Sequence, residues 1–167
     1  MTDNFIQLGK EDTLKLKIVD SEGKETGEYL EFNLEDVDLP LRYQDAIEKS
    51  KKNRIELQNK LKMIEQRKDV KGKKAFSKNE EDKFKALADF YKAEESIYDM
   101  FLGENGVKKL LNGRALGWTS LREIDNLIEK QIMPYIEKSI ENTYDKIDKL
   151  YNIDENGSVL KWTILNA

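Results

Sequence analysis

The sequence predicts an α+β domain that is mainly α-helical, with an N-terminal β-hairpin packed on three to four helices. In the first 40 residues apolar and polar side chains alternate, which is typical of half-buried strands. From about residue 39 onward apolar side chains recur every three or four positions, which indicates amphipathic helices. The length of 167 residues fits a single domain with its own core. We divide the chain into a hairpin portion, 1–38, a helical portion, 39–151, and an apolar C-terminal tail, 152–167.

The hairpin is expected from two alternating segments. Their apolar positions are Leu14, Leu16 and Ile18 in the first segment and Leu30, Phe32 and Leu34 in the second. Residues 20–27 between them contain two glycines and several small polar residues, which predicts a long hairpin loop. Because a two-stranded ribbon is only marginally stable alone, its apolar face must pack on the helices that follow.

The first helix is expected to begin near Asp38, an N-cap candidate just before Pro40, and to run to about Lys68. One face carries a heptad-like stripe formed by Tyr43, Ile47, Ser50, Arg54, Leu57, Leu61 and Ile64. The polar residues Ser50 and Arg54 interrupt this stripe. We therefore favour a long amphipathic helix packed within its own domain, and an intermolecular coiled coil is the alternative.

The boundaries of the later helices are predicted from capping residues and from glycine and proline, which interrupt helices. The lysine-rich residues 69–78 are expected to form a mobile connection, and Ser77 with Glu80 forms a capping box for a second helix that ends at Gly103. A short helix is expected over 107–112. Ser120 and Glu123 form another capping box, which opens a helix that continues to Tyr151. Pro134 lies inside this last helix and predicts a kink or break around residues 132–133.

The absence of cysteine and histidine narrows the possible chemistry. It excludes disulfides, thiol nucleophiles, the usual zinc sites and imidazole catalysis. No glycine-rich phosphate loop or nucleophile elbow is present. We assign no catalytic, cofactor-binding or metal-binding residue and expect a non-enzymatic protein. Glu94 and Glu95 fall in the apolar face of the second helix, where we expect an ion pair or an exposed rim position rather than catalysis.

Positive charge is concentrated in one region. The chain has 29 Lys and Arg against 33 Asp and Glu, yet residues 48–78 hold 12 basic and 4 acidic residues. Such a stretch could bind phosphates non-specifically. It has no aromatic residue between Tyr43 and Phe76 to stack on bases, and lysine outnumbers arginine. A solvated lysine-rich face, which could meet an acidic partner, is therefore favoured over nucleic-acid binding.

Residues 97–114, followed by 121–135, resemble the C-terminal half of tail assembly chaperone-like proteins of long-tailed phages and prophages of Gram-positive bacteria. In that family a helix ends in a glycine-containing turn, a short apolar helix closed by glycine follows, and a longer helix comes next. The N-terminal segment 5–9 and the overall order of elements are also similar. The matched positions are Phe101, Leu102, Gly103, Gly106, Val107, Leu110 and Gly113. For each of them a core or cap role is expected to outweigh direct binding.

The resemblance implies a cytoplasmic accessory protein that binds the tail tube protein, the tape measure protein or both during tail morphogenesis. Self-association is possible, whereas membrane binding is not expected, because the sequence has no apolar stretch long enough to span a bilayer. Nucleic-acid binding through 48–78, in a small regulatory protein, is the alternative function. The tail contributes candidate contact residues Val159, Leu160, Trp162 and Ile164. A final strand that pairs with the N-terminal hairpin is the alternative for this tail.

Overall fold

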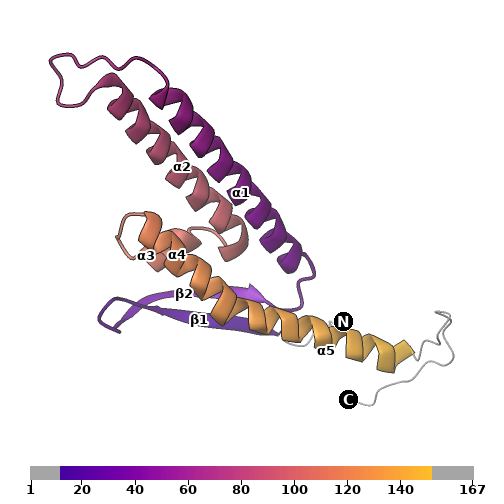
Figure 1. Ribbon diagram of the computed structural model, residues 1–167. Helices are drawn as coiled ribbons and strands as arrows, with labels where there is room; N and C mark the ends of the chain where they lie inside the picture. Colours follow the sequence, from indigo (N-terminus) through magenta and orange to yellow (C-terminus); the bar gives the residue numbers. More distant parts are fainter. Residues whose placement is uncertain (1–11, 152–167) are drawn as a thin grey trace, which may run out of the picture.

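The structure is a computed structural model in which residues 12–151 are described. Its elements are β1 (Thr13–Val19), β2 (Glu25–Asn33), α1 (Asp38–Glu65), α2 (Lys78–Leu102), α3 (Gly106–Leu111), α4 (Trp118–Leu127), the π-helical turn η1 (Ile128–Ile132) and α5 (Met133–Tyr151). This order confirms the α+β class, with an N-terminal hairpin followed by helices (Figure 1). None of the helices within 12–151 is long and apolar enough to cross a membrane.

β1 and β2 form a two-stranded antiparallel sheet in which Leu16 lies opposite Leu30. The connecting turn spans residues 20–24 and is shorter than the loop expected over 20–27. The Asp20 carboxylate closes it by accepting hydrogen bonds from the N–H groups of Glu22 and Lys24, both at 2.9 Å. The inner face of the hairpin is buried at Ile18, Leu30 and Phe32, as the alternation predicts.

α1 and α2 pack against each other and form a long arm that projects from the rest of the molecule (Figure 1). This packing confirms that the first helix packs within its own chain. The expected cap at Asp38 is wrong, because Asp38 is already the first helical residue. The Asp36 carboxylate takes the capping role instead and accepts the Asp38 N–H at 2.9 Å. α1 ends at Glu65, three residues before the expected end.

Side-chain hydrogen bonds tie the connection between α1 and α2 to both helices. The Ser77 capping box is confirmed, since Ser77 N–H donates to the Glu80 carboxylate at 2.7 Å and Glu80 N–H donates to the Ser77 hydroxyl at 3.2 Å. The Asn79 amide donates to the carbonyls of Ile64 and Arg67 at 2.9 and 3.1 Å, at the end of α1. The segment expected to be mobile is therefore anchored at its two ends.

The apolar core joins the hairpin, the lower part of the arm, α3, α4, η1 and the start of α5. Val107 and Ile132 are fully buried in it, and Leu121 is 1% exposed. In Figure 1 the rod formed by α4, η1 and α5 crosses over the hairpin. The Ser139 hydroxyl fixes this crossing by donating to the Leu34 carbonyl at 2.8 Å, just beyond β2.

The break expected near Pro134 is confirmed as a π-helical turn. η1 ends at Ile132, and the Met133 N–H bonds to the carbonyl of Ile128, five residues earlier. Pro134 follows directly and has no N–H to contribute to the helix. The wider turn therefore changes the hydrogen-bond register at the point where the proline interrupts it.

The expected start of this rod at Ser120 is wrong. α4 begins at Trp118, with Gly117 as the flanking residue. Ser120 lies within the first turn, and its hydroxyl oxygen accepts the Gly117 N–H at 2.8 Å. The serine thus satisfies a backbone donor of the helix start from inside the helix rather than from the N-cap position.

Candidate functional site

The residues matched to the phage family form the connection from α2 through α3 to α4. Phe101 and Leu102 are each 3% exposed and Val107 is fully buried, so these three side chains belong to the core. Leu110 is half-buried against the same core. The apolar motif positions therefore lie within the core or against it.

The glycines of the motif have conformational and steric roles. Gly103 and Gly113 have φ angles of 93° and 83°, which residues other than glycine rarely adopt. Gly106 has no room for a side chain, because a Cβ there would lie 2.6 Å from the Cβ of Leu102. The candidate tail residues Val159, Leu160, Trp162 and Ile164 lie outside the described residues.

Asp99 connects the end of α2 to the start of α3. Its carboxylate accepts the Val107 N–H at 2.8 Å. Burial raises the pKa of the Asp99 carboxyl, and the hydrogen bond from Val107 opposes that rise. Asp99 therefore positions the motif turn.

A groove of about 200 Å³ lies between α1, the end of α2 and the junction of α4 with η1. We call it the interhelical groove. Its apolar lining consists of Tyr43, Ala46, Ile47, Ile97, Phe101 and Ile128. Its polar lining consists of Ser50, Lys51, Arg54, Tyr98, Asp125 and Glu129. Phe101 is the one family-motif residue in this lining.

The floor of the interhelical groove is held by aromatic contacts. The ring of Phe101 lies 5.1 Å from the ring of Tyr43 in α1 and 5.5 Å from the ring of Phe32 in β2, measured between centroids. Tilted aromatic pairs at this separation are favourable beyond the area they bury. Phe101 therefore fixes the distance between the arm and the hairpin.

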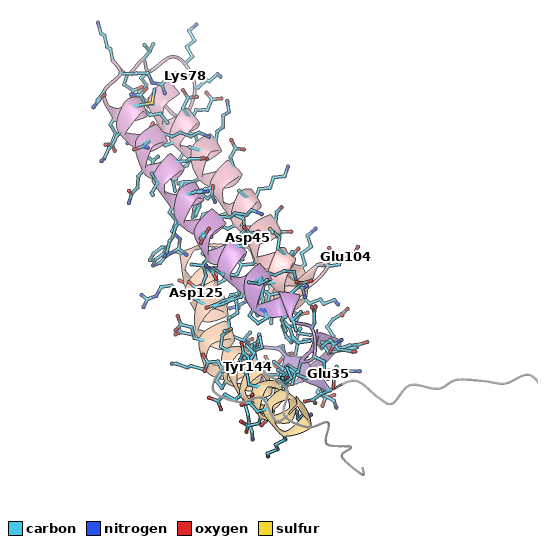
Figure 2. All side chains as sticks on the ribbon, turned by 90° about the vertical axis from the view of Figure 1, so that its right-hand side faces the viewer. Glu35, Asp45, Lys78, Glu104, Asp125 and Tyr144 are labelled. Atoms are coloured by element: carbon cyan, nitrogen blue, oxygen red, sulfur yellow. The ribbon has the colours of Figure 1, made fainter. Side chains whose placement is uncertain are left out.

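Opposite charges lie on the two walls of the groove. Lys51 and Arg54 come from α1, whereas Asp125 comes from α4 and Glu129 from η1. The Nη2 atom of Arg54 is 3.8 Å from the Asp125 carboxylate. The Nε atom of Arg54 is buried and has no hydrogen-bond partner within the described residues. Figure 2 shows Asp125 between Lys78 at the tip of the arm and Tyr144 at the opposite end.

Tyr98 links α2 to the acidic wall, because its hydroxyl donates a hydrogen bond to the Asp125 carboxylate. Burial raises the pKa of the Tyr98 hydroxyl, and the hydrogen bond to Asp125 raises it further. Tyr98 is therefore a neutral hydrogen-bond donor at physiological pH. It orients Asp125 and cannot act there as a base.

Glu94 is fully buried between α1 and α2, next to the groove. Its carboxylate accepts hydrogen bonds from the Ser50 hydroxyl at 2.8 Å and from the Asn53 amide at 2.7 Å. The expectation of an ion pair or an exposed rim position is wrong for Glu94. It fits Glu95, whose carboxylate lies 3.5 Å from Lys108.

A signal for the Glu94 contact was present in the sequence. Ser50 interrupts the apolar stripe of α1, and Glu94 interrupts the apolar face of α2. Buried polar groups are hydrogen-bonded as a rule, so two interruptions on facing helices indicate a pair. The register between the helices, which brings them together, is not readable from either helix alone.

Part of the positive charge of 48–78 is neutralised within the chain. Five of its basic residues form ion pairs, which are Lys49–Asp45, Arg54–Asp125, Arg67–Asp82, Lys74–Glu81 and Lys78–Asp82. Most of these pairs are well exposed and contribute little to stability. Within residues 12–151 there is no cluster of three or more acidic side chains arranged to hold a metal ion.

No protein-family model matches the chain, and no match was found among curated proteins or solved structures. Function is therefore inferred from the interhelical groove together with the resemblance carried by residues 97–135.

Proposed function

We propose that the chain is a non-enzymatic phage tail assembly chaperone or accessory protein that acts in the cytoplasm of the host cell. It binds a helical segment of the tail tube protein or the tape measure protein in the interhelical groove. The observation that carries this proposal is the apolar floor of the groove between walls of opposite charge. The family resemblance of residues 97–135 supplies the identity of the partners.

The groove suits recognition of an amphipathic helix. In helix-in-groove binding, apolar side chains spaced three or four residues apart enter an apolar channel. Ile47 on the wall is 36% exposed and Ile128 in the floor is 3% exposed, so an incoming side chain meets apolar surface at both depths. The volume of about 200 Å³ accepts one or two large side chains rather than a whole helix.

The charges of the walls set the orientation of the partner. Acidic residues on the partner helix would face Lys51 and basic residues would face Glu129, because Arg54 and Asp125 already pair with each other. Complementary charge speeds encounter and disfavours the reversed orientation more than it adds affinity. A tape measure protein exposes long apolar helical stripes before the tail polymerises, and several of its segments could present this pattern in turn.

Co-expression of the tagged chain with the tail tube and tape measure products encoded beside it tests the proposal. The groove variant Ile47→Glu should lose the retained partner, because it places a charge on the apolar wall. Ile55→Glu is the matched control, since Ile55 lies on the same helix, is 56% exposed and is outside the groove. The proposal is wrong if the folded wild-type chain retains neither product, or if the two variants behave alike.

The alternative is a regulatory or nucleic-acid-associated protein that uses the basic region 48–78. It is favoured by the basic residues of that region that take part in no ion pair of the described chain, which are Lys51, Lys52, Lys60, Lys62, Lys68, Lys71 and Lys73. Binding through such lysines would weaken steeply as salt concentration rises. Retention on heparin at low salt supports this alternative, and no retention counts against it.

A further inference from the structure

The second half of α5 carries an apolar stripe that the described residues leave exposed. Upstream, the apolar face of the rod is in the core, where three residues are at most 3% exposed, namely Ile128, Ile132 and Ile136. Beyond Ser139 the side chains of residues 140–149 are all exposed. They include Ile140, Tyr144 and Ile147, which are 36%, 65% and 40% exposed and continue the spacing of the core face. A helical end of this kind gains stability when another surface covers its stripe.

An acidic stripe borders the apolar stripe of α5. Its four residues are spaced three or four apart and share one side of the helix: Glu137, Glu141, Asp145 and Asp148. None of them forms an ion pair with another described residue. Glu137 and Tyr144 differ by seven residues, or about two turns, so the two stripes run side by side. We call the two stripes together the α5 surface.

The tip of the α1–α2 arm has the opposite charge and exposed apolar side chains of its own. Residues 66–76 contain five basic residues and one acidic residue. Three of the lysines form no ion pair within residues 12–151, namely Lys68, Lys71 and Lys73. Val70, Phe76 and Phe84 are 65%, 53% and 53% exposed, and the two phenylalanine rings pack edge to face at 5.1 Å between centroids. We call these six residues the tip surface.

The tip surface and the α5 surface lie at opposite ends of the molecule. Figure 1 shows the arm pointing away from the free end of α5, and Lys78 and Tyr144 mark the two ends in Figure 2. α1 alone has 28 residues and is about 42 Å long, so the tip of one chain cannot cover α5 of the same chain. We propose that the tip surface covers the α5 surface of a second copy, and that copies associate head to tail.

The two surfaces are complementary in charge and in apolar character. The lysines of the tip meet the acidic stripe, while Phe76 and Phe84 meet Tyr144 and the isoleucines beside it. An apolar centre with a charged rim is the usual composition of a protein interface. Complementary charge also speeds the encounter of the two ends. Tip-to-tip and α5-to-α5 contacts are disfavoured, because they bring like charges together.

A contact between two different surfaces is heterologous, which sets the kind of assembly it forms. After the first contact, one copy still has a free tip surface and the other still has a free α5 surface. Further copies can therefore add until a ring closes or an open chain grows. A symmetric dimer, in contrast, would use the same surface on both copies and stop at two.

Sedimentation velocity of the full-length chain at low salt tests the proposal with substitutions at exposed positions. Wild type should form species larger than a monomer. Phe76→Asp and Tyr144→Asp should each be monomeric at the same concentration, because each variant loses one of the two surfaces. Lys146→Asp is the matched control, since Lys146 lies two residues from Tyr144 and therefore on the opposite side of α5, and it should assemble like wild type. Circular dichroism verifies that the helices persist in each variant.

A mixture of the two monomeric variants distinguishes a head-to-tail contact from a symmetric one. F76D keeps its α5 surface and Y144D keeps its tip surface, so one intact contact can form between them. The equimolar mixture should give a species of two chains and nothing larger. A mixture that stays monomeric overturns the proposal, as does a wild type that is monomeric at low salt. Assembly that persists in F76D or Y144D alone lies on another surface and overturns it as well.

Reversal of charge gives a second readout. K71E/K73E should weaken association at least about tenfold, and adding E141K/D145K to the same chain should restore it, because the two surfaces then exchange sign. Failure of the combined variant to recover would contradict the contact between these stripes. A monomeric wild type that binds heparin through Lys71 and Lys73 would assign the tip to a polyanion instead. Slow hydrogen exchange at 140–149 in a monomer would assign the cover of α5 to the same chain, and either result overturns the proposal.

This inference goes beyond the proposed function and uses different residues. Ile47→Glu changes the interhelical groove and neither of the two surfaces, whereas Tyr144→Asp changes the α5 surface and not the groove. Failure of one proposal therefore leaves the other open to its own test.

Discussion

The lower and upper halves of the α1–α2 arm are built from the same two helices but are stabilised differently. In the lower half, Leu39 and Ala46 of α1 and Phe101 and Leu102 of α2 belong to the core that also includes the hairpin and α3 to α5. In the upper half, Ile64, Ala86 and Phe90 are buried but lie outside that core. The fully buried Glu94, with Ser50 and Asn53, marks the boundary.

The comparison shows where apolar burial is sufficient to fix the position of a helix and where polar contacts are needed as well. A helix in the lower half packs against several elements at once, so its apolar stripe specifies its position. A helix in the upper half meets one partner, and an apolar stripe alone allows the two helices to slide. We infer that the Glu94 cluster fixes their register, in the way that a single buried polar residue fixes a coiled coil. The interhelical groove lies at the same level, where the arm leaves the body.

The largest effect on stability is expected in the body of the molecule, by which we mean the part outside the α1–α2 arm. Ile132→Ala should lower the free energy of unfolding by about 2–5 kcal/mol, because Ile132 is fully buried and the cavity cannot collapse readily. Chemical denaturation followed by circular dichroism measures this loss. A loss below about 1 kcal/mol would contradict the central place that we give to η1 in the core.

A smaller effect is expected at the boundary between the two halves. Glu94→Ala should cost about 1–3 kcal/mol, since it leaves the Ser50 hydroxyl without its carboxylate acceptor and leaves the Asn53 amide with the Phe90 carbonyl alone. The double variant S50A/E94L should recover part of this loss, because it removes Glu94 together with its donor Ser50 and restores volume, while the Asn53 amide keeps its bond to the Phe90 carbonyl. Nuclear Overhauser spectra report the register through contacts between α1 and α2. If the double variant recovers stability but these contacts change, Glu94 specifies the register of the two helices rather than their stability. A double variant with wild-type register would contradict the role assigned to Glu94.

Tyr98 provides a pH-dependent test of the lower half. Tyr98→Phe should cost about 1.5–3 kcal/mol near neutral pH through the lost hydrogen bond to the Asp125 side chain. The pKa of Tyr98 is raised in the folded state from its ordinary value of 10.0. Above that value the unfolded chain releases the proton before the folded chain does, so the wild type loses stability that the phenylalanine variant keeps. The difference between the two chains should therefore shrink from pH 7 to about pH 11 in urea denaturation. If the stability difference between the two chains stays constant over this pH range, the pKa of Tyr98 is the same in the folded and unfolded chains.

The smallest effect is expected at the tip of the arm. Asn79→Ala removes two hydrogen bonds, to the carbonyl of Ile64 in the last turn of α1 and to that of Arg67 just beyond it, and should cost about 1 kcal/mol. Because the upper half lies outside the main core, this loss should appear as faster hydrogen exchange confined to the tip. Equal acceleration in the body would contradict the separation of the two halves.

The sequence predicted the features that depend on neighbouring residues. The alternation of Leu14, Leu16 and Ile18, the Ser77 capping box and the break before Pro134 each act within one element, and each is confirmed. The burial of Glu94 and the interhelical groove depend on how separate helices are placed, and no single helix carries that information. The glycine turn at residues 103–106 was identified from the sequence, but the steric need for glycine at position 106 depends on where Leu102 is placed, because a Cβ at Gly106 would lie 2.6 Å from the Cβ of Leu102.

The most direct test of the account is hydrogen exchange of the chain alone and in complex with a co-purified tail tube or tape measure segment. We expect new protection at residues 43–54 of α1 and at residues 125–129 across the interhelical groove, with the tip of the arm unchanged. Protection confined to the tip, or a folded chain that forms no complex with either product, would contradict the assignment of the groove as the binding site.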